Sequence, residues 1–97
     1  MTDRAGRMSA KAEIGWKGRT PEGERREVYV RHVGGEWRFH VRGRRFEEWQ
    51  PLPDPPLEDW LELLDAVERR VQRRLLRPEE PARIRKSIRE RFPDSGI

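Results

Sequence analysis

The chain has 97 residues, of which 41% are charged and 33% hydrophobic, and its net charge is +4. This length suits one domain, since domains typically have about 100–150 residues. Cysteine is absent, which excludes disulfides and thiolate chemistry, and no apolar run approaches the ~18 residues that a membrane span needs. The N-terminal residues have no apolar segment typical of a signal peptide, so we expect a soluble, cytoplasmic protein.

Hydropathy divides the chain into three parts. Residues 1–10 are polar and aperiodic, which predicts a disordered N-terminal arm. Residues 11–93 have periodic apolar positions and are expected to form a single α+β domain. Residues 94–97 follow a proline that ends the last periodic segment, so we expect a flexible C-terminal tail.

The first periodic segment alternates as a strand does. From Lys11 to Lys17 every second residue is apolar, namely Ala12, Ile14 and Trp16. The segment from Gly18 to Arg25 is rich in glycine and turn-forming residues, so we expect a loop there.

A β-hairpin is the clearest local prediction. Two alternating runs, Glu27–Val33 and Glu36–Arg42, flank the pair Gly34-Gly35, and glycine tolerates the positive φ that tight hairpin turns need. A register that pairs Val33 with Glu36 places the apolar side chains on one face and the polar ones on the other. The apolar face then has Val28, Val30, His32, Trp37, Phe39 and Val41. The polar face pairs Arg31 with Arg38, Tyr29 with His40 and Glu27 with Arg42.

The segment after the hairpin is harder to assign. A turn at Gly43-Arg44 and a short fourth strand over Phe46–Gln50 are predicted, although Phe46 and Trp49 cannot share one face of a regular strand. Four prolines follow, and Asp54 is expected to cap a helix whose first residue is Pro55.

Two helices complete the predicted fold. The first has an apolar stripe with Leu63 at its edge and continues toward Pro78, and the second has a narrower stripe and ends at Pro93. The first stripe consists of Leu57, Trp60, Leu61, Leu64, Val67, Val71 and Leu75. The second consists of Ile84, Ile88 and Phe92. The fold class is therefore α+β, a three- or four-stranded antiparallel β-meander followed by two α-helices packed on one sheet face.

No catalytic or metal-binding pattern is present. The two histidines, His32 and His40, fall on opposite faces of the predicted hairpin and cannot share an ion, and structural zinc usually has four Cys or His ligands. No serine has an evident base beside it. We expect no catalytic residues, no metal, no cofactor and no enzyme activity.

Charge indicates two candidate binding surfaces. Ten basic side chains and three acidic ones lie between residues 69 and 91, a balance typical either of a phosphate-binding surface or of a solvated helix face. The candidate polyanion-binding residues are Arg69, Arg70, Arg73, Arg74, Arg77, Arg83, Lys86 and Arg89. The second candidate is the polar face of the hairpin, with Tyr29, Arg31, Arg38 and His40, where an aromatic ring flanked by cations could stack single-stranded bases.

Two functional hypotheses remain open. The first is a non-catalytic protein-interaction or accessory module, with an unidentified protein partner or a homodimer formed through Leu63 and Leu76. The alternative is binding of a nucleic acid or another polyanion through the basic C-terminal helical pair. No membrane partner is expected.

Overall fold

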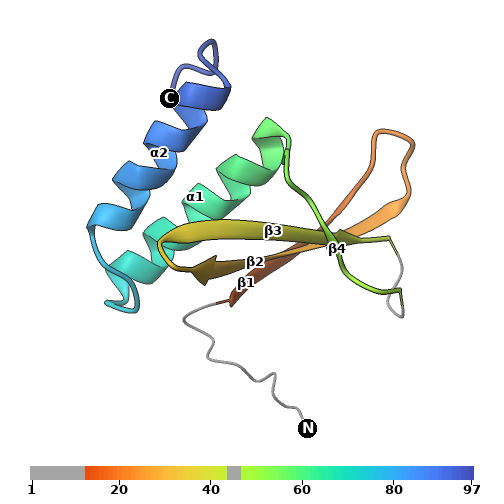
Figure 1. The fold of residues 1–97 in the computed structure, drawn as a ribbon, viewed down its shortest axis with the longest axis horizontal. Helices are drawn as coiled ribbons and strands as arrows, with labels where there is room; N and C mark the ends of the chain where they lie inside the picture. The colour runs from red at the N-terminus through yellow and green to blue at the C-terminus, as the bar shows by residue number, and fades with distance from the viewer. Residues whose placement is uncertain (1–12, 44–46) are drawn as a thin grey trace, which may run out of the picture. The chain divides into compact units, whose positions relative to one another are not determined.

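The computed structural model describes residues 13–43 and 47–97 (Figure 1). The chain divides at Asp54–Pro55 into two compact units, first a sheet unit and then a helical unit. The four strands precede the two helices, so the predicted α+β class, with an antiparallel meander followed by two helices, is confirmed. The expected arm over residues 1–10 lies outside the described residues. A single domain over residues 11–93 and the packing of the helices on the sheet stay predictions.

The sheet has four antiparallel strands in chain order, β1-β2-β3-β4. Alternating apolar residues give its first three strands one apolar and one polar face. Their bounds are β1 Glu13–Arg19, β2 Arg25–Val33, β3 Glu36–Arg42 and β4 Gln50–Pro51.

The hairpin of β2 and β3 has the predicted turn and register. Gly34 and Gly35 have φ values of 57° and 84°, as a turn with two left-handed residues requires. Every predicted pair is present, from Val33 opposite Glu36 at the turn to Glu27 opposite Arg42 at the far end. On the apolar face Val28, Val30 and Phe39 are buried, as is Ile14 of β1, whereas Trp37 and Val41 are only half-buried.

The strand boundaries differ from the sequence prediction at two places. β1 continues to Arg19 and β2 begins at Arg25, so the loop predicted over Gly18–Arg25 is shorter. Thr20 closes this loop, since its backbone N–H donates to the Glu24 carbonyl at 2.9 Å and its hydroxyl accepts from the Glu24 N–H at 3.1 Å. The fourth strand exists but lies later than Phe46–Gln50. It pairs Gln50 with Val41 and Pro51 with His40, and Pro51 is tolerated there because β4 is an edge strand.

Helix α1, Leu57–Gln72, begins later than the sequence predicts. Its N-cap is Pro56, and neither the predicted Asp54 cap nor a first helical residue at Pro55 is found. The cause is the pair of consecutive prolines. A residue that precedes a proline is disfavoured in the helical conformation, so Pro55, which precedes Pro56, cannot be the first helical residue. Pro56 itself is extended, with ψ of 164°, and has no side chain that could cap the helix.

α1 also ends earlier than predicted. The N–H of Leu75 donates to the Arg70 carbonyl at 2.8 Å, and the N–H of Arg74 donates to the Val71 carbonyl at 2.9 Å. These two bonds define a Schellman motif, in which the residue at the Arg74 position is left-handed, and Arg74 has φ of 61°. The motif closes the helix after Gln72, so Leu75 lies outside α1 and is 39% exposed.

The buried face of α1 is rotated from the predicted stripe. Leu63, expected at the edge of the stripe, is fully buried at 0% exposure, whereas Leu61, expected within it, is 38% exposed. The buried residues are Asp59, Trp60, Leu63, Leu64, Ala66 and Val67. At 100° per residue this arc is centred near Leu63, because Ala66 contributes to it although it is too small to mark a stripe in the sequence. Leu63 is therefore not part of an exposed apolar edge, and the homodimer expected through it is not proposed.

Helix α2, Glu79–Arg91, follows the prediction closely. Pro78 is its N-cap, Ile84 and Ile88 are buried, and Phe92 is the C-cap ahead of Pro93. After it, the N–H of Ser95 donates to the Phe92 carbonyl at 3.0 Å. Neither α1 nor α2 is long and apolar enough to cross a membrane, and these are the helices in the described part of the chain.

Candidate functional site

One face of the sheet unit consists of polar and aromatic side chains, and we call it the polar face. Paired residues of antiparallel strands project to the same side, so the register fixes its membership. Its described residues are Gly15, Lys17, Arg19, Arg25, Glu27, Tyr29, Arg31, Val33, Glu36, Arg38, His40, Arg42 and Pro51. The four sheet residues predicted as a site, Tyr29, Arg31, Arg38 and His40, all lie on this face.

Aromatic rings gather at the centre of the polar face. Tyr29 and His40 stack across β2 and β3, with ring centroids 4.7 Å apart and planes 17° apart. Trp49 joins them from the segment before β4, with its ring 4.8 Å from that of Tyr29 at 73°. Sequence reasoning missed Trp49 as a site residue, because no periodicity marks it. The signal in the sequence that could have identified Trp49 is its position out of alternation with Phe46 in the predicted fourth strand.

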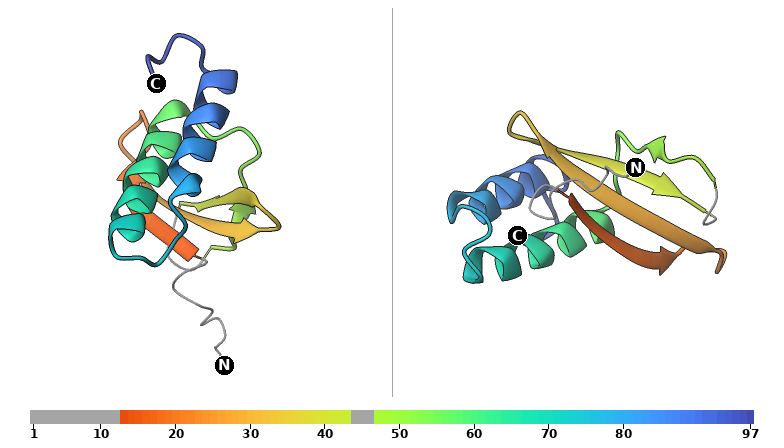
Figure 2. Two further views of the ribbon diagram at one scale, coloured as in Figure 1. Left: turned by 90° about the vertical axis from the view of Figure 1, so that its left-hand side faces the viewer. Right: turned by 90° about the horizontal axis from the view of Figure 1, so that it is seen from below.

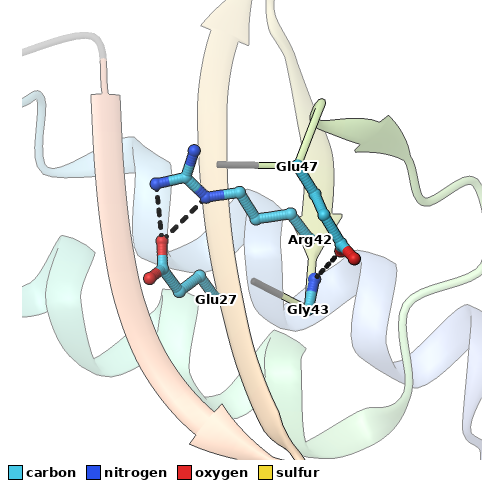
Figure 3. Close-up of polar contacts among 4 residues, drawn as sticks. All are labelled: Glu27, Arg42, Gly43 and Glu47. Atoms are coloured by element: carbon cyan, nitrogen blue, oxygen red, sulfur yellow. Dashed lines mark hydrogen bonds and ion pairs between the residues drawn. The ribbon is translucent and has the colours of Figure 1, made fainter. Parts of the chain in front are cut away.

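Arg42 connects this aromatic cluster to a carboxylate, and Figure 3 shows its contact with that carboxylate. Its Nε and Nη2 each lie 2.9 Å from Glu27 Oε1, and its guanidinium carbon lies 4.3 Å from the centre of the Trp49 ring. The next residue, Gly43, donates its backbone N–H to Glu47 Oε1 at 3.1 Å. The side chains of Arg42 and Glu27 are only 21% and 14% exposed, so solvent screens this pair weakly.

The polar face has an excess of positive charge. Arg31 and Arg38 lie directly opposite each other, and like charges at paired positions repel. Glu36 Oε1 lies 3.6 Å from Arg38 Nε, and both side chains are exposed, so solvent screens this ion pair strongly. The basic residues of the face are Lys17, Arg19, Arg25, Arg31, Arg38 and Arg42, and its described carboxylates are those of Glu27 and Glu36.

An open groove of about 490 Å³ lies within the sheet unit. It is lined by Thr20, Glu24, Arg25, Arg26, Val41, Arg42, Gly43, Glu47, Glu48 and Gln50. Among these described lining residues three arginines and three glutamates balance each other, so together they favour neither an anionic nor a cationic ligand.

The two helices of the helical unit run side by side in opposite directions (Figures 1 and 2). Arg85 of α2 donates to Glu68 of α1, and the guanidinium of Arg91 lies 5.2 Å from the centre of the Trp60 ring. These two contacts show which parts of α1 and α2 lie beside each other. The C-terminal end of α1 is therefore beside the N-terminal end of α2, at the connection between them.

This arrangement separates the eight predicted polyanion-binding residues into two groups. Six lie at the connection, and we call them the arginine cluster: Arg69, Arg70, Arg73, Arg74, Arg77 and Arg83. Lys86 and Arg89 lie further along α2, toward its C-terminal end.

Some of these cations are paired and others are not. Arg69 Nη1 lies 2.7 Å from Asp65 Oδ2, and Arg83 Nη1 lies 3.7 Å from the buried carboxylate of Glu80. The remaining exposed residues form no ion pair with another described residue, and they are Arg73, Arg74, Arg77, Lys86 and Arg89.

The pKa of Arg70 is affected by the other charges of the arginine cluster. Partial burial lowers the pKa of its guanidinium, and the neighbouring charges of Arg69 and Arg73 lower it further. Crowded like charges disfavour the protonated form, and a bound anion would relieve their repulsion. The cluster is thus a region of positive potential at the end of a helix whose C-terminal dipole also favours cations.

A metal site has no support in the described residues. No group of three potential His, Cys, Asp or Glu ligands comes together in residues 13–43 and 47–97. His32 stacks on Trp37 with ring centroids 4.1 Å apart, on the face opposite to His40. The two histidines are therefore separated by the sheet, as the alternation predicts.

Comparisons with protein-family models, with curated proteins and with solved structures give no match to this chain. Residue roles therefore follow from the two surfaces alone, the polar face and the arginine cluster. Both surfaces have more described cations than described carboxylates, although Glu79 and Glu80 lie in the first turn of α2 beside the arginine cluster, and each surface can attract an anionic partner.

Proposed function

We propose that the protein is a non-catalytic binding module that contacts the phosphate backbone of a nucleic acid through the arginine cluster. The observation that supports this most directly is that three exposed arginines at the connection, Arg73, Arg74 and Arg77, form no ion pair with another described residue. A guanidinium binds a phosphate through two parallel hydrogen bonds, so three adjacent arginines suit a run of phosphates.

The crowding of charge around Arg70 is consistent with this proposal. Partial burial lowers the pKa of its guanidinium, and the neighbouring charges of Arg69 and Arg73 in the same cluster lower it further. A nucleic-acid backbone supplies closely spaced negative charges, and releasing its counterions favours binding.

A protein partner held by an apolar surface has weaker support. The large hydrophobic residues that are exposed in the described part of the chain are Val33 in β2, Leu61 in α1 and Leu75 in the connection between the helices. Scattered apolar residues are ordinary on protein surfaces and form no patch. Charge is therefore the property on which we base the proposed function.

The test is the salt dependence of binding to a fluorescein-labelled 20-base-pair DNA duplex, followed by fluorescence anisotropy. The variant replaces Arg73, Arg74 and Arg77 by glutamine. Each lost phosphate contact should reduce the slope of log K against log salt by about 0.9, and affinity should fall for every duplex sequence.

A matched control removes three positive charges from the polar face by replacing Lys17, Arg25 and Arg38 with glutamine. Both triple variants have the same net charge, so a difference between them reports position and not total charge. The proposal requires the cluster variant to weaken duplex binding more than the control does. Equal effects, or a wild-type protein that does not bind the duplex at 50 mM salt, would overturn it.

A further inference from the structure

We infer that the polar face binds single-stranded nucleic acid, with bases stacked at the cluster of Tyr29, His40 and Trp49. This inference rests on the proposed function and narrows its ligand class. The arginine cluster can contact the phosphates of a duplex or of a single strand, whereas aromatic rings can reach only bases that are not already stacked and paired.

Charge complementarity supports a nucleic acid as the occupant of this face. Six basic side chains lie on the polar face, and its two described carboxylates are already engaged by basic neighbours. Glu27 is held by Arg42, and Glu36 lies beside Arg38. The six cations are divided equally among β1, β2 and β3, two on each strand, so a nucleic-acid backbone that crosses this face meets positive charge on every strand.

The aromatic residues of the polar face are accessible, unlike those of the core. Tyr29, His40 and Trp49 are half-buried, whereas Phe39 on the opposite face is 4% exposed. Opposite Tyr29 on β1 is Gly15, which has no side chain to cover the ring from that direction. A base could therefore reach the cluster from the β1 side.

Arg42 adds a second stacking plane. Its guanidinium lies over the Trp49 ring, and the hydrogen bonds to Glu27 hold it in that position. Bases stack on arginine planes as well as on aromatic rings in single-strand binding proteins. The polar face thus combines rings, a fixed guanidinium and surrounding cations, which are the elements of sequence-tolerant single-strand recognition.

The decisive experiment compares a 20-nucleotide thymidine oligomer with the DNA duplex, both measured by fluorescence anisotropy on the full chain. Replacing Trp49 with leucine should weaken binding of the oligomer about tenfold and leave duplex affinity unchanged. The polar-face triple variant of Lys17, Arg25 and Arg38 should also weaken the oligomer alone. Equal losses for both probes, or no loss for either, would overturn the inference.

A second measurement covers the case in which the leucine variant does not fold. The conservative variant Trp49→Phe keeps an aromatic ring, so it should bind the oligomer within about threefold of wild type. It should, however, lose most of the tryptophan quenching that the oligomer causes in the wild-type protein. Undiminished quenching in Trp49→Phe would show that no base stacks at this position.

The same data separate this inference from the proposed function. A wild-type protein that binds neither probe contradicts the proposed function and the inference together. A protein that binds duplex and oligomer equally, and loses both in the arginine-cluster variant alone, supports the proposed function and contradicts the inference.

Discussion

Arg42 meets a single carboxylate oxygen of Glu27 through two nitrogen atoms, Nε and Nη2, each 2.9 Å from Oε1. Both side chains are largely shielded from solvent, with 21% and 14% of their surface exposed. Removing one partner of such a pair leaves a poorly solvated charge. We therefore expect Glu27→Gln to reduce the free energy of unfolding by about 1–2 kcal/mol, measured by urea denaturation.

The control for this prediction is the ion pair between Asp65 and Arg69. Its atoms are 2.7 Å apart, but its side chains are 61% and 59% exposed. Exposed i,i+4 pairs stabilise helices by about 0.3–0.5 kcal/mol, so Asp65→Asn should have a much smaller effect. Similar losses in the two variants would mean that the Glu27 pair is as well solvated as the exposed one.

The hairpin register makes Phe39 the most sensitive aromatic residue of the sheet. Phe39 is 4% exposed and lies opposite Val30, which is 0% exposed. Phe39→Ala should cost about 3–5 kcal/mol, which threatens a protein of this size. In the same hairpin Val33 is 37% exposed, and Val33→Ala should cost less than about 1 kcal/mol. Thermal melts of both variants, followed by circular dichroism, test the difference.

The hairpin was predictable because two independent signals agree. The glycine pair fixes the turn, and the alternation on both sides allows one register in which apolar residues share a face. The polar face follows from the same register, so the candidate residues Tyr29, Arg31, Arg38 and His40 were placed correctly on one side. Neither signal depends on contacts between distant parts of the chain.

Other features depend on local geometry that apolar periodicity does not record. The start of α1 is set by Pro56 acting on Pro55, and its end is set by an arginine in a conformation that glycine usually adopts. Trp49 reaches Tyr29 from outside a regular strand, where alternation makes no prediction. The arginine cluster was identified from charge, but its separation from Lys86 and Arg89 required the antiparallel arrangement of the helices.

The rotated face of α1 can be tested with two leucines two positions apart. Leu63 is fully buried and Leu61 is 38% exposed. Leu63→Ala should therefore destabilise the protein by about 2–5 kcal/mol. Leu61→Ala should change stability by less than about 1 kcal/mol, since alanine also has the higher helix propensity. Urea midpoints in the reverse order would place the buried stripe where the sequence alone predicts it.

The Schellman motif at the end of α1 predicts a stabilising substitution. Arg74 has φ of 61°, a conformation that costs about 1–2 kcal/mol for a residue with a Cβ atom and little for glycine. Arg74→Gly should raise the free energy of unfolding by about 0.5–1 kcal/mol, because the greater freedom of glycine in the unfolded chain offsets part of the gain.

Arg73 is the matched control, since it precedes Arg74, loses the same charge on substitution and has φ of −90°. Arg73→Gly relieves no strain, so it should destabilise the protein by about 0.5–1 kcal/mol. Urea denaturation of the two variants should give midpoints on opposite sides of wild type, and two midpoints on the same side would contradict the left-handed conformation of Arg74.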